Sequence, residues 1–344
     1  MTDPAGTAMT LLLLAQVALL AAMVSAGLNL LLLPWLKTYA LARPNARSSH
    51  REATPQGGGG AVIIATFAVA WAGSAILAGA FSTGETSQLL ALTAAVALLA
   101  LVGGIDDIRA LAPLPRLLLQ GLAVGIVIAA LPAELRLVAM LPWWIERGLI
   151  LLAGIWFINL TNFMDGIDWM TVAEVVPVTG AIVLLGLLGI VPPLPTLVAV
   201  ALLGAVLGFA PFNKPVAKLF LGDVGSLPIG FVLGWLLLHV AGRGELAAAL
   251  ILPLYYVADA TLTLIRRMAT GEAISQAHRS HFYQRAVDGG FTAPEIVARV
   301  FAVNLLLVAL ALIATASRMV SLAALIAGAA LVCWLLLRFA RGKP

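Results

Sequence analysis

The sequence predicts an all-α, polytopic membrane protein with about eleven transmembrane helices. Of its 344 residues, 62% are hydrophobic and only 10% are charged, and the mean hydropathy is +1.06. Apolar runs long enough to cross a bilayer recur along the whole chain. A soluble domain of this composition could not cover its surface with polar side chains. We therefore expect one integral membrane domain over residues 1–344.

Apolar stretches of membrane-spanning length mark the expected spans. The first lacks the early basic region and cleavage site of a signal peptide, so we interpret it as a span. Eleven crossings would place the two termini on opposite sides of the membrane. The expected spans are residues 9–33, 61–81, 89–105, 116–131, 143–161, 174–191, 196–212, 226–241, 246–267, 295–316 and 320–337.

The distribution of Lys and Arg predicts the orientation. Fifteen of these residues fall in one set of alternate loops and four in the other, with Arg299 inside a predicted span. The positive-inside rule then places the N-terminus outside and the C-terminus in the cytoplasm. The same rule accounts for the net charge of +4, so we expect no nucleic-acid partner. The single cysteine, Cys333, excludes an intrachain disulfide and a zinc thiolate cluster.

Residues capable of chemistry are concentrated on the predicted cytoplasmic side. They occupy the loops near 37–60, 106–116, 159–173, 213–226 and 266–294. This one-sided arrangement predicts an active site on the cytoplasmic face. A transporter or flippase of an anionic lipid or amphipath is the alternative. Such proteins favour inverted repeats and polar groups at mid-membrane, and the sequence shows no repeat that relates its two halves.

The stretch 159–168 combines amides and carboxylates at steps of three residues: Asn159, Asn162, Asp165 and Asp168. On a helix these side chains would share one face, whereas in a loop Gly166 would let the backbone approach a ligand. Such groups can bind a nucleobase or sugar, and a carboxylate can act as a base. The alternative is a polar turn that caps the next helix.

Two acidic motifs suggest a site for a metal ion and phosphates. Asp106 and Asp107 are adjacent at the end of a predicted span, and neighbouring carboxylates repel unless a cation neutralises them. Asp223 lies in a Gly-Asp-x-Gly-Ser turn at the start of another span, where freed N–H groups can bind an anion. A solvated helix end and an ordinary capped turn are the alternatives.

Two histidines and an arginine lie in the longest basic loop: His278, His281 and Arg285. Histidine and arginine together suit a phosphate or pyrophosphate group, whereas a zinc site would need further ligands. A basic loop attracted to anionic lipid is the alternative. Asp259, inside a predicted span, either lines a cavity or pairs with Arg266.

The order and spacing of these motifs resemble the polyprenyl-phosphate N-acetylhexosamine-1-phosphate transferases (glycosyltransferase family 4). This family includes the phospho-N-acetylmuramoyl-pentapeptide translocase and the bacterial undecaprenyl-phosphate sugar-1-phosphate transferases. The matching pieces run from Ser49 to Arg285. They are a Ser-His…Thr-Pro…Gly-Gly loop, the aspartate pair followed by Arg116 and Gln120, the Asn-x-x-Asn-x-x-Asp-Gly-x-Asp stretch, Asn213, Phe220, the Gly-Asp-x-Gly-Ser turn and the histidine loop.

The resemblance implies an enzyme of the bacterial inner membrane with its active site in the cytoplasm. It implies transfer of a sugar 1-phosphate from a UDP-N-acetylhexosamine, or a UDP-N-acetyl-6-deoxyhexosamine, to undecaprenyl phosphate with release of UMP. The product would initiate a cell-surface polysaccharide such as O-antigen. The implied cofactor is Mg²⁺, with Mn²⁺ as a substitute, and a homodimer is left open.

The resemblance also implies roles for individual residues. Arg116 stands where the family commonly has a lysine, a third acidic residue is absent at Arg109-Ala110-Leu111, and the histidine loop is sparser than in the muramoyl-pentapeptide enzyme. The implied metal ligands are Asp223, Asp106 and Asp107. The implied catalytic residues are Asp106, Asp107, Asp165, His278 and His281. The implied substrate-binding residues are His50, Thr54, Arg116, Asn159, Asn162, Asp168, Asn213, Lys218, Phe220 and Arg285.

Overall fold

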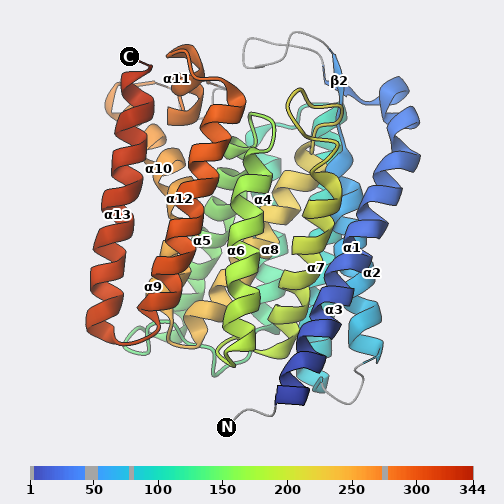
Figure 1. Ribbon diagram of the computed structural model, residues 1–344, viewed down its shortest axis with the longest axis vertical. Helices are drawn as coiled ribbons and strands as arrows, with labels where there is room; N and C mark the ends of the chain where they lie inside the picture. Colours follow the sequence, from blue (N-terminus) through green and yellow to red (C-terminus); the bar gives the residue numbers. More distant parts are fainter. Residues whose placement is uncertain (1–3, 43–52, 77–80, 273–277, 344) are drawn as a thin grey trace.

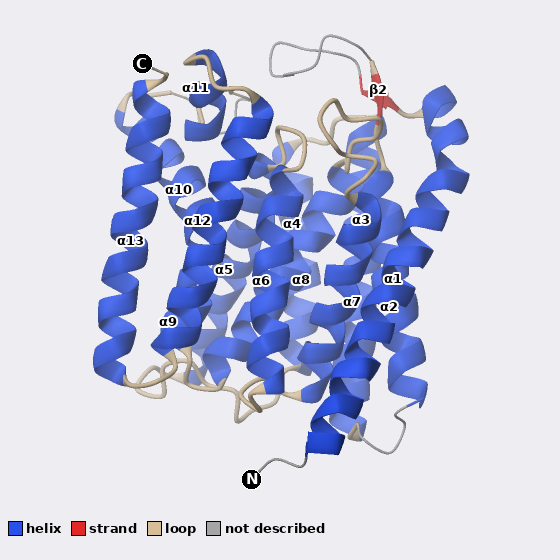
Figure 2. Cartoon of the chain, viewed as in Figure 1, coloured by secondary structure: helices blue, strands red, loops and turns tan. Residues whose placement is uncertain are grey.

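Helices that run between two ends of the molecule form almost all of the structure (Figures 1 and 2). The computed structural model describes residues 4–42, 53–76, 81–272 and 278–343. The helices are α1 (Pro4–Tyr39), α2 (Gly58–Ile76), α3 (Thr83–Ile108), α4 (Pro113–Ala130), α5 (Trp143–Met164), α6 (Met170–Leu187), α7 (Pro193–Phe209), α8 (Asp223–Gly242), α9 (Leu246–Ile251), α10 (Leu254–Ala269), α11 (Phe282–Asp288), α12 (Ala293–Ala314) and α13 (Arg318–Arg341).

The predicted class is confirmed: the protein is an all-helical, multi-pass membrane protein. Within the described residues, nine helices are long and apolar enough to cross a bilayer, rather than the eleven that the sequence predicted. The predicted span 196–212 corresponds to α7, which is apolar but has only 17 residues. The predicted span 246–267 is not one helix but two, α9 and α10.

The break between α9 and α10 falls at Leu252 and Pro253. Proline has no N–H to continue the hydrogen-bond ladder, but it is tolerated at a helix start, which is where Pro253 lies. Four residues at four-residue spacing are then buried along α10: Tyr255, Asp259, Thr263 and Arg267. This polar face turns into the protein, which explains why the segment does not read as a uniformly apolar span.

The two ends of the described chain lie at opposite ends of the helix bundle (Figure 1). In the same view α9 lies toward the end near the N-terminus and α10 toward the other, so together they cross the bundle. This arrangement agrees with an odd number of crossings. Which end faces the cytoplasm remains a prediction from the distribution of Lys and Arg.

Helix α8 is the centre of the bundle. In its most apolar 18-residue window 83% of the residues are buried, compared with 11% in α1 and 22% in α4. Helices α2, α3, α5 and α9 all pack against it. The close approach of α3 depends on Gly103, where a Cβ would lie 2.2 Å from the carbonyl oxygen of Asp223. This packing brings the end of α3 beside the start of α8.

A short strand pair connects the region after α1 to the start of α8. Strands β1 (Leu41–Ala42) and β2 (Thr54–Pro55) are antiparallel. The segment after β2 then pairs with Phe220, whose N–H donates to the Pro55 carbonyl at 2.8 Å and whose carbonyl accepts from the Gly57 N–H at 3.1 Å. Gln56 is thereby held at the same end of the bundle as Asp223.

Candidate active site

Two connected cavities open at the end of the bundle where the C-terminus lies. The larger has a volume of about 950 Å³ and the smaller about 180 Å³. Residues from four separate segments line both of them, so they form one site. The shared residues are Gln56, Asp107, Asn162, Gly166 and Asp223.

Asp107 joins the end of α3 to the start of α8. Its two carboxylate oxygens accept hydrogen bonds from the backbone N–H groups of Asp223 at 2.9 Å and Val224 at 3.0 Å. A carboxylate is well placed at a helix N-terminus, where four N–H groups lack partners. The preceding Gly222 has φ 77°, and a Cβ there would lie 2.6 Å from Asp107 Oδ2. The Gly-Asp turn is therefore required for this contact.

Asp106 faces the larger cavity together with Arg116 of α4. The Arg116 guanidinium donates to Asp106 Oδ2 at 3.0 Å, and the Leu111 N–H donates to Asp106 Oδ1 at 2.6 Å. The Nε of Arg116 is buried and has no hydrogen-bond partner among the described residues. A buried guanidinium N–H without an acceptor, at the wall of a cavity, is suited to an anionic ligand.

Asn162 fixes the side chain of Asp223. Its Nδ2 donates to Asp223 Oδ1 at 2.7 Å and to Ser226 Oγ at 2.8 Å. Asn159, one turn earlier in α5, forms an amide pair with Gln120 of α4, with Nδ2 donating to Gln120 Oε1 at 2.6 Å. These two asparagines are helical, whereas α5 ends at Met164. The predicted helical stripe therefore holds for the asparagines and not for the two aspartates that follow.

Asp165 lies in the loop after α5 and lines the smaller cavity. Its Oδ1 accepts a hydrogen bond from the Thr171 hydroxyl. Burial raises the pKa of the Asp165 carboxyl to about 7, and the negative charges of Asp223, Asp107 and Asp168 add to the shift. A cation bound among these carboxylates would favour their ionised forms.

Asp168 and Asn213 organise the loops around the smaller cavity. The Ala217 N–H donates to Asp168 Oδ2 at 3.0 Å. Asn213 accepts from the Trp169 N–H at 2.8 Å and donates to the Leu219 carbonyl at 3.1 Å. Trp169 has φ 63°, an unusual value for a residue other than glycine. Asp168 and Asn213 both line the smaller cavity, as does Phe220.

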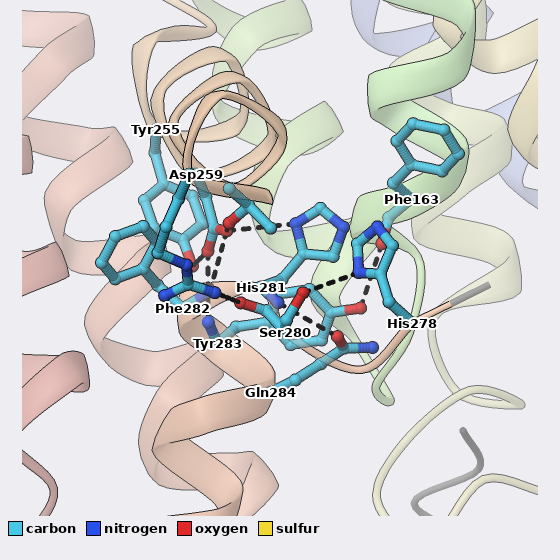
Figure 3. Close-up of polar contacts among 11 residues, drawn as sticks. Phe163, Tyr255, Asp259, His278, Ser280, His281, Phe282, Tyr283 and Gln284 are labelled. Carbon is cyan, nitrogen blue, oxygen red and sulfur yellow. Dashed lines mark hydrogen bonds and ion pairs between the residues drawn. The ribbon is translucent and has the colours of Figure 1, made fainter. Parts of the chain in front are cut away.

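His278 and His281, which Figure 3 shows next to each other, also line the larger cavity. Their ring centroids are 4.9 Å apart. Tyr283 follows them, and its hydroxyl donates to the Phe163 carbonyl at 3.0 Å. A Cβ at Gly166 would lie 2.0 Å from that hydroxyl. Gly166 is thus needed for the approach of Tyr283, whereas the sequence suggested an approach to a ligand.

Of the predicted substrate-binding residues that the structure describes, three do not line these cavities. Lys218 is exposed, and Arg285 lies over the Phe282 ring, with its guanidinium carbon 5.9 Å from the ring centre. Thr54 is buried in β2. His50 lies outside the described residues. The described chain therefore supplies the basic side of the cavity through Arg116 and the histidines.

The structure adds cavity residues that the sequence analysis did not select. Gln56 lines both cavities and donates from Nε2 to the Asp107 carbonyl at 2.9 Å. Its position next to the Gly-rich segment 57–60 was the available signal. Trp156, Phe163, Tyr283 and Gln284 also line the larger cavity. The three aromatic residues resemble ordinary packing residues and so carried no sequence signal, whereas Gln284 lies within the histidine loop.

The acidic residues fit a hard divalent cation bound together with a ligand. Within the described part of the chain, no three His, Cys, Asp or Glu side chains form a ready metal cage. Mg²⁺, however, is usually held by one or two carboxylates, waters and substrate phosphates. The Asp223 carboxylate meets that of Asp106 in this cavity and is also near Asp107. These carboxylates repel one another, and a bound divalent cation would offset that repulsion.

Apolar side chains complete the larger cavity on the side of α4, α5 and α10. They include Leu117, Leu152 and Leu264. Leu117 and Leu152 are 41% and 64% exposed, so the cavity wall continues onto the apolar exterior of the bundle. The site therefore combines an acidic centre, basic groups and a route to the membrane interior.

Comparisons with known proteins identify related sequences. The sequence profile of glycosyl transferase family 4 matches residues 89–241. The chain is 26% identical over 269 residues to a probable undecaprenyl-phosphate N-acetylglucosaminyl 1-phosphate transferase of Bacillus subtilis (strain 168), with 75% of this chain and 72% of the relative covered.

Two phospho-N-acetylmuramoyl-pentapeptide-transferases are also similar. That of Synechococcus sp. (strain RCC307) is 31% identical over 246 residues, which cover 62% of this chain and 65% of the relative. That of Leuconostoc mesenteroides subsp. mesenteroides is 32% identical over 199 residues, which cover 52% of this chain and 59% of the relative. The chain thus spans somewhat less than two thirds of the length of these two relatives. From the matched profile and these relatives, the chain belongs to glycosyl transferase family 4, a family of phosphotransferases that act on UDP-sugars and polyprenyl phosphates.

Proposed function

We propose that the protein transfers N-acetylhexosamine 1-phosphate, or its 6-deoxy equivalent, from the UDP-sugar to undecaprenyl phosphate. UMP leaves, and the lipid-diphosphate-linked sugar initiates a cell-surface polysaccharide. The observation that best supports this proposal is the larger cavity, which Asp106, Asp107 and Asp223 line together with His278, His281 and partly exposed apolar side chains. The aspartates and the histidines suit a nucleotide sugar, and the apolar side chains suit a polyprenyl chain.

The two cavities suggest where each substrate binds. The smaller one has the amide and carboxylate groups of Asn213 and Asp168 beside the Phe220 ring, a combination suited to a uridine. The larger one has Arg116 at its polar end and Leu117 and Leu152 at its apolar end. This second combination suits the phosphate and first isoprene units of the acceptor. Asp223 lines both cavities, where the phosphates of the two substrates would meet.

The proposed reaction is direct attack of the acceptor on the nucleotide sugar. An oxygen of the lipid monophosphate, largely a dianion at neutral pH, bonds to the phosphorus that carries the sugar. The bond from that phosphorus to the oxygen shared with UMP breaks, and UMP takes the electron pair. A magnesium ion held by Asp223 and its acidic neighbours would offset the repulsion between phosphates. Arg116 and the histidines would supply positive charge from the protein.

The contacts of the aspartate pair support direct attack over a covalent aspartyl-phosphate. Both oxygens of Asp107 accept backbone N–H groups. Those of Asp106 accept from Leu111 and Arg116. A carboxylate held in this way is stabilised as an acceptor and is a weaker nucleophile. We expect no isotope exchange between UMP and UDP-sugar when lipid is absent, and exchange without lipid would show a covalent intermediate.

The function can be tested directly with the purified protein. It is incubated with Mg²⁺, undecaprenyl phosphate and a panel of UDP-sugars, and release of UMP is measured. We expect release with a UDP-N-acetylated sugar, and only when Mg²⁺ or Mn²⁺ and the lipid are present. Added UMP should reverse the reaction, because one phosphoanhydride replaces another. No UMP release with any UDP-sugar would contradict the proposal.

A further inference from the structure

A buried carboxylate outside the acidic centre contacts the histidine loop (Figure 3). Asp259 of α10 is 0% exposed, and it lies outside residues 89–241, which match the family profile. It is not one of the residues that line the two cavities. A charged group at such a position is costly unless several partners compensate for its burial. The hydrogen-bond partners of Asp259 therefore indicate its role.

Five donors surround the Asp259 carboxylate. The backbone N–H groups of Phe282 and Tyr283 donate at 2.9 Å and 3.1 Å. His281 Nδ1 lies 3.2 Å from Oδ1. The hydroxyls of Tyr255 and Thr263 complete the set, each at 3.4 Å. All five can donate when Nδ1 of His281 carries its hydrogen, so the carboxylate acts only as an acceptor.

This set of contacts determines the orientation of the His281 ring. With Nδ1 directed at Asp259, Nε2 is the ring nitrogen that remains for a ligand. His281 is 2% exposed, and its ring lies between Asp259 and His278 in Figure 3. The stacked Tyr283 ring, with centroids 5.8 Å apart and planes at 18°, restricts its rotation. His281 lines the larger cavity with Asp106, Asp107 and Asp223.

In many functional sites a carboxylate accepts a hydrogen bond from one ring nitrogen of a histidine, as Asp259 does here. The carboxylate selects the tautomer and stabilises the imidazolium, so that the other nitrogen can donate a hydrogen bond or a proton. Here the same carboxylate also anchors the backbone at the start of α11. One buried residue thus connects α10, the histidine loop and α11.

We propose that Asp259 is a positioning residue that holds His281 as the Nδ1–H form, with Nε2 directed into the larger cavity toward the phosphate groups of the substrates. This inference rests on the proposed function for the identity of those phosphates. Asp259 itself touches no reacting atom. Its effect passes through His281, which donates from Nε2 to a phosphate oxygen.

A double-mutant cycle tests whether Asp259 acts through His281. Asp259→Asn keeps the shape of the side chain and removes its charge. We expect kcat to fall roughly 10- to 100-fold, as when other carboxylate partners of functional histidines are removed, with KM for the UDP-sugar changed less than about twofold. In a His281→Gln background the same substitution should change kcat by less than about threefold.

Two outcomes of the cycle would overturn the inference. One is an unchanged kcat in Asp259→Asn. The other is a full further loss in the His281→Gln background, which would assign Asp259 a role independent of His281. Glu174→Gln is the matched control, because Glu174 is also a buried helical carboxylate with a hydrogen-bond partner, Asn304, and it lines neither cavity. We expect that control to retain wild-type kcat.

A second measurement does not depend on activity. The chain has four histidines, so ¹⁵N-histidine NMR of the detergent-solubilised protein is practicable, and His281→Gln assigns the His281 signals. We expect Nδ1 of His281 to carry a hydrogen in the wild-type protein, and an unprotonated Nδ1 would overturn the inference. If the wild type released no UMP, the proposed function would fail, while the NMR result would still decide the Asp259–His281 contact.

Discussion

At the scale of single residues, the site depends on a few carboxylates that have very different partners. Asp107 accepts a hydrogen bond from the backbone at the start of α8. Asp106 accepts one from Arg116, and Asp223 accepts one from Asn162. Asp165 has one hydroxyl partner and is otherwise buried among negative charges. Because each carboxylate is held differently, substitutions at these positions should have distinguishable effects.

Asp223→Asn should abolish transfer without unfolding the protein. Asparagine can still accept the hydrogen bond from Asn162 at 2.7 Å, but it lacks the charge needed to hold a cation. We expect UMP release to fall by roughly 10²-fold or more, with an unchanged thermal unfolding midpoint. Asp288→Asn is the control, since the Asp288 side chain is 58% exposed and forms an ion pair with Arg279. Turnover within a few fold of wild type would make the metal assignment wrong.

Asp165→Asn should stabilise the protein above neutral pH in the absence of divalent cations. Burial raises the pKa of Asp165 from 3.8 to about 7, so the folded state binds a proton that the unfolded state has released. The stability from this proton is present below the unfolded pKa and is lost as the pH rises through about 7. Asparagine cannot ionise. Its unfolding midpoint, measured in EDTA, should exceed that of wild type at pH 8 by more than at pH 5.

At the scale of elements, two local contacts bring distant segments into one site. The first is the Gly222 turn, which lets the α8 N-terminus meet Asp107 of α3. The second is the packing of α11 against the loop after α5, where Tyr283 donates to the Phe163 carbonyl over Gly166. The histidine loop reaches the cavity because α11 is held at both Asp259 and this contact.

Gly166→Ala should displace α11 from α5. Its Cβ would lie 2.0 Å from the Tyr283 hydroxyl and 3.0 Å from Cζ. We expect a loss of about 1–3 kcal/mol in stability, typical of overpacking, and a fall in transfer activity. Tyr283→Phe removes the closest atom, so the double variant should recover part of both losses. Equal stability of Gly166→Ala and wild type, measured by thermal unfolding, would contradict the observed approach.

At the scale of the whole molecule, helix α8 is enclosed while α1 and α4 present apolar faces. The candidate site lies at the end of the bundle shared by the C-terminus and opposite the N-terminus (Figure 1). A substrate from the cytoplasm and a lipid from the membrane would therefore meet at one end of the protein. This arrangement needs no passage across the membrane.

The C-terminus and the site should both face the cytoplasm. We expect a C-terminal green fluorescent protein fusion to fluoresce and a C-terminal alkaline phosphatase fusion to be inactive in bacteria. Fifteen Lys and Arg residues on that side against four on the other are the physical reason. The reverse pattern of reporter activity would contradict both the orientation and a cytoplasmic UDP-sugar site.

The sequence by itself determined the membrane class, most of the helices, the acidic motifs and the family. Hydropathy is a local property, and the Asp106, Asn162 and Asp223 motifs are short segments whose spacing is read directly. It did not separate α9 from α10, because the break at Pro253 lies inside one apolar run, and it counted α7 as a full span although that helix has only 17 residues.

Only the tertiary structure decided which residues share the cavity. It joined Gln56 to Asp107 and left Lys218 and Arg285 out of the lining of both cavities. It also paired Asp259 with His281, 22 residues later. The two pairings arise where the segment after β2 meets the end of α3 and where the histidine loop meets α10. Such contacts depend on side-chain shape and burial across segments far apart in the chain, which no local pattern encodes.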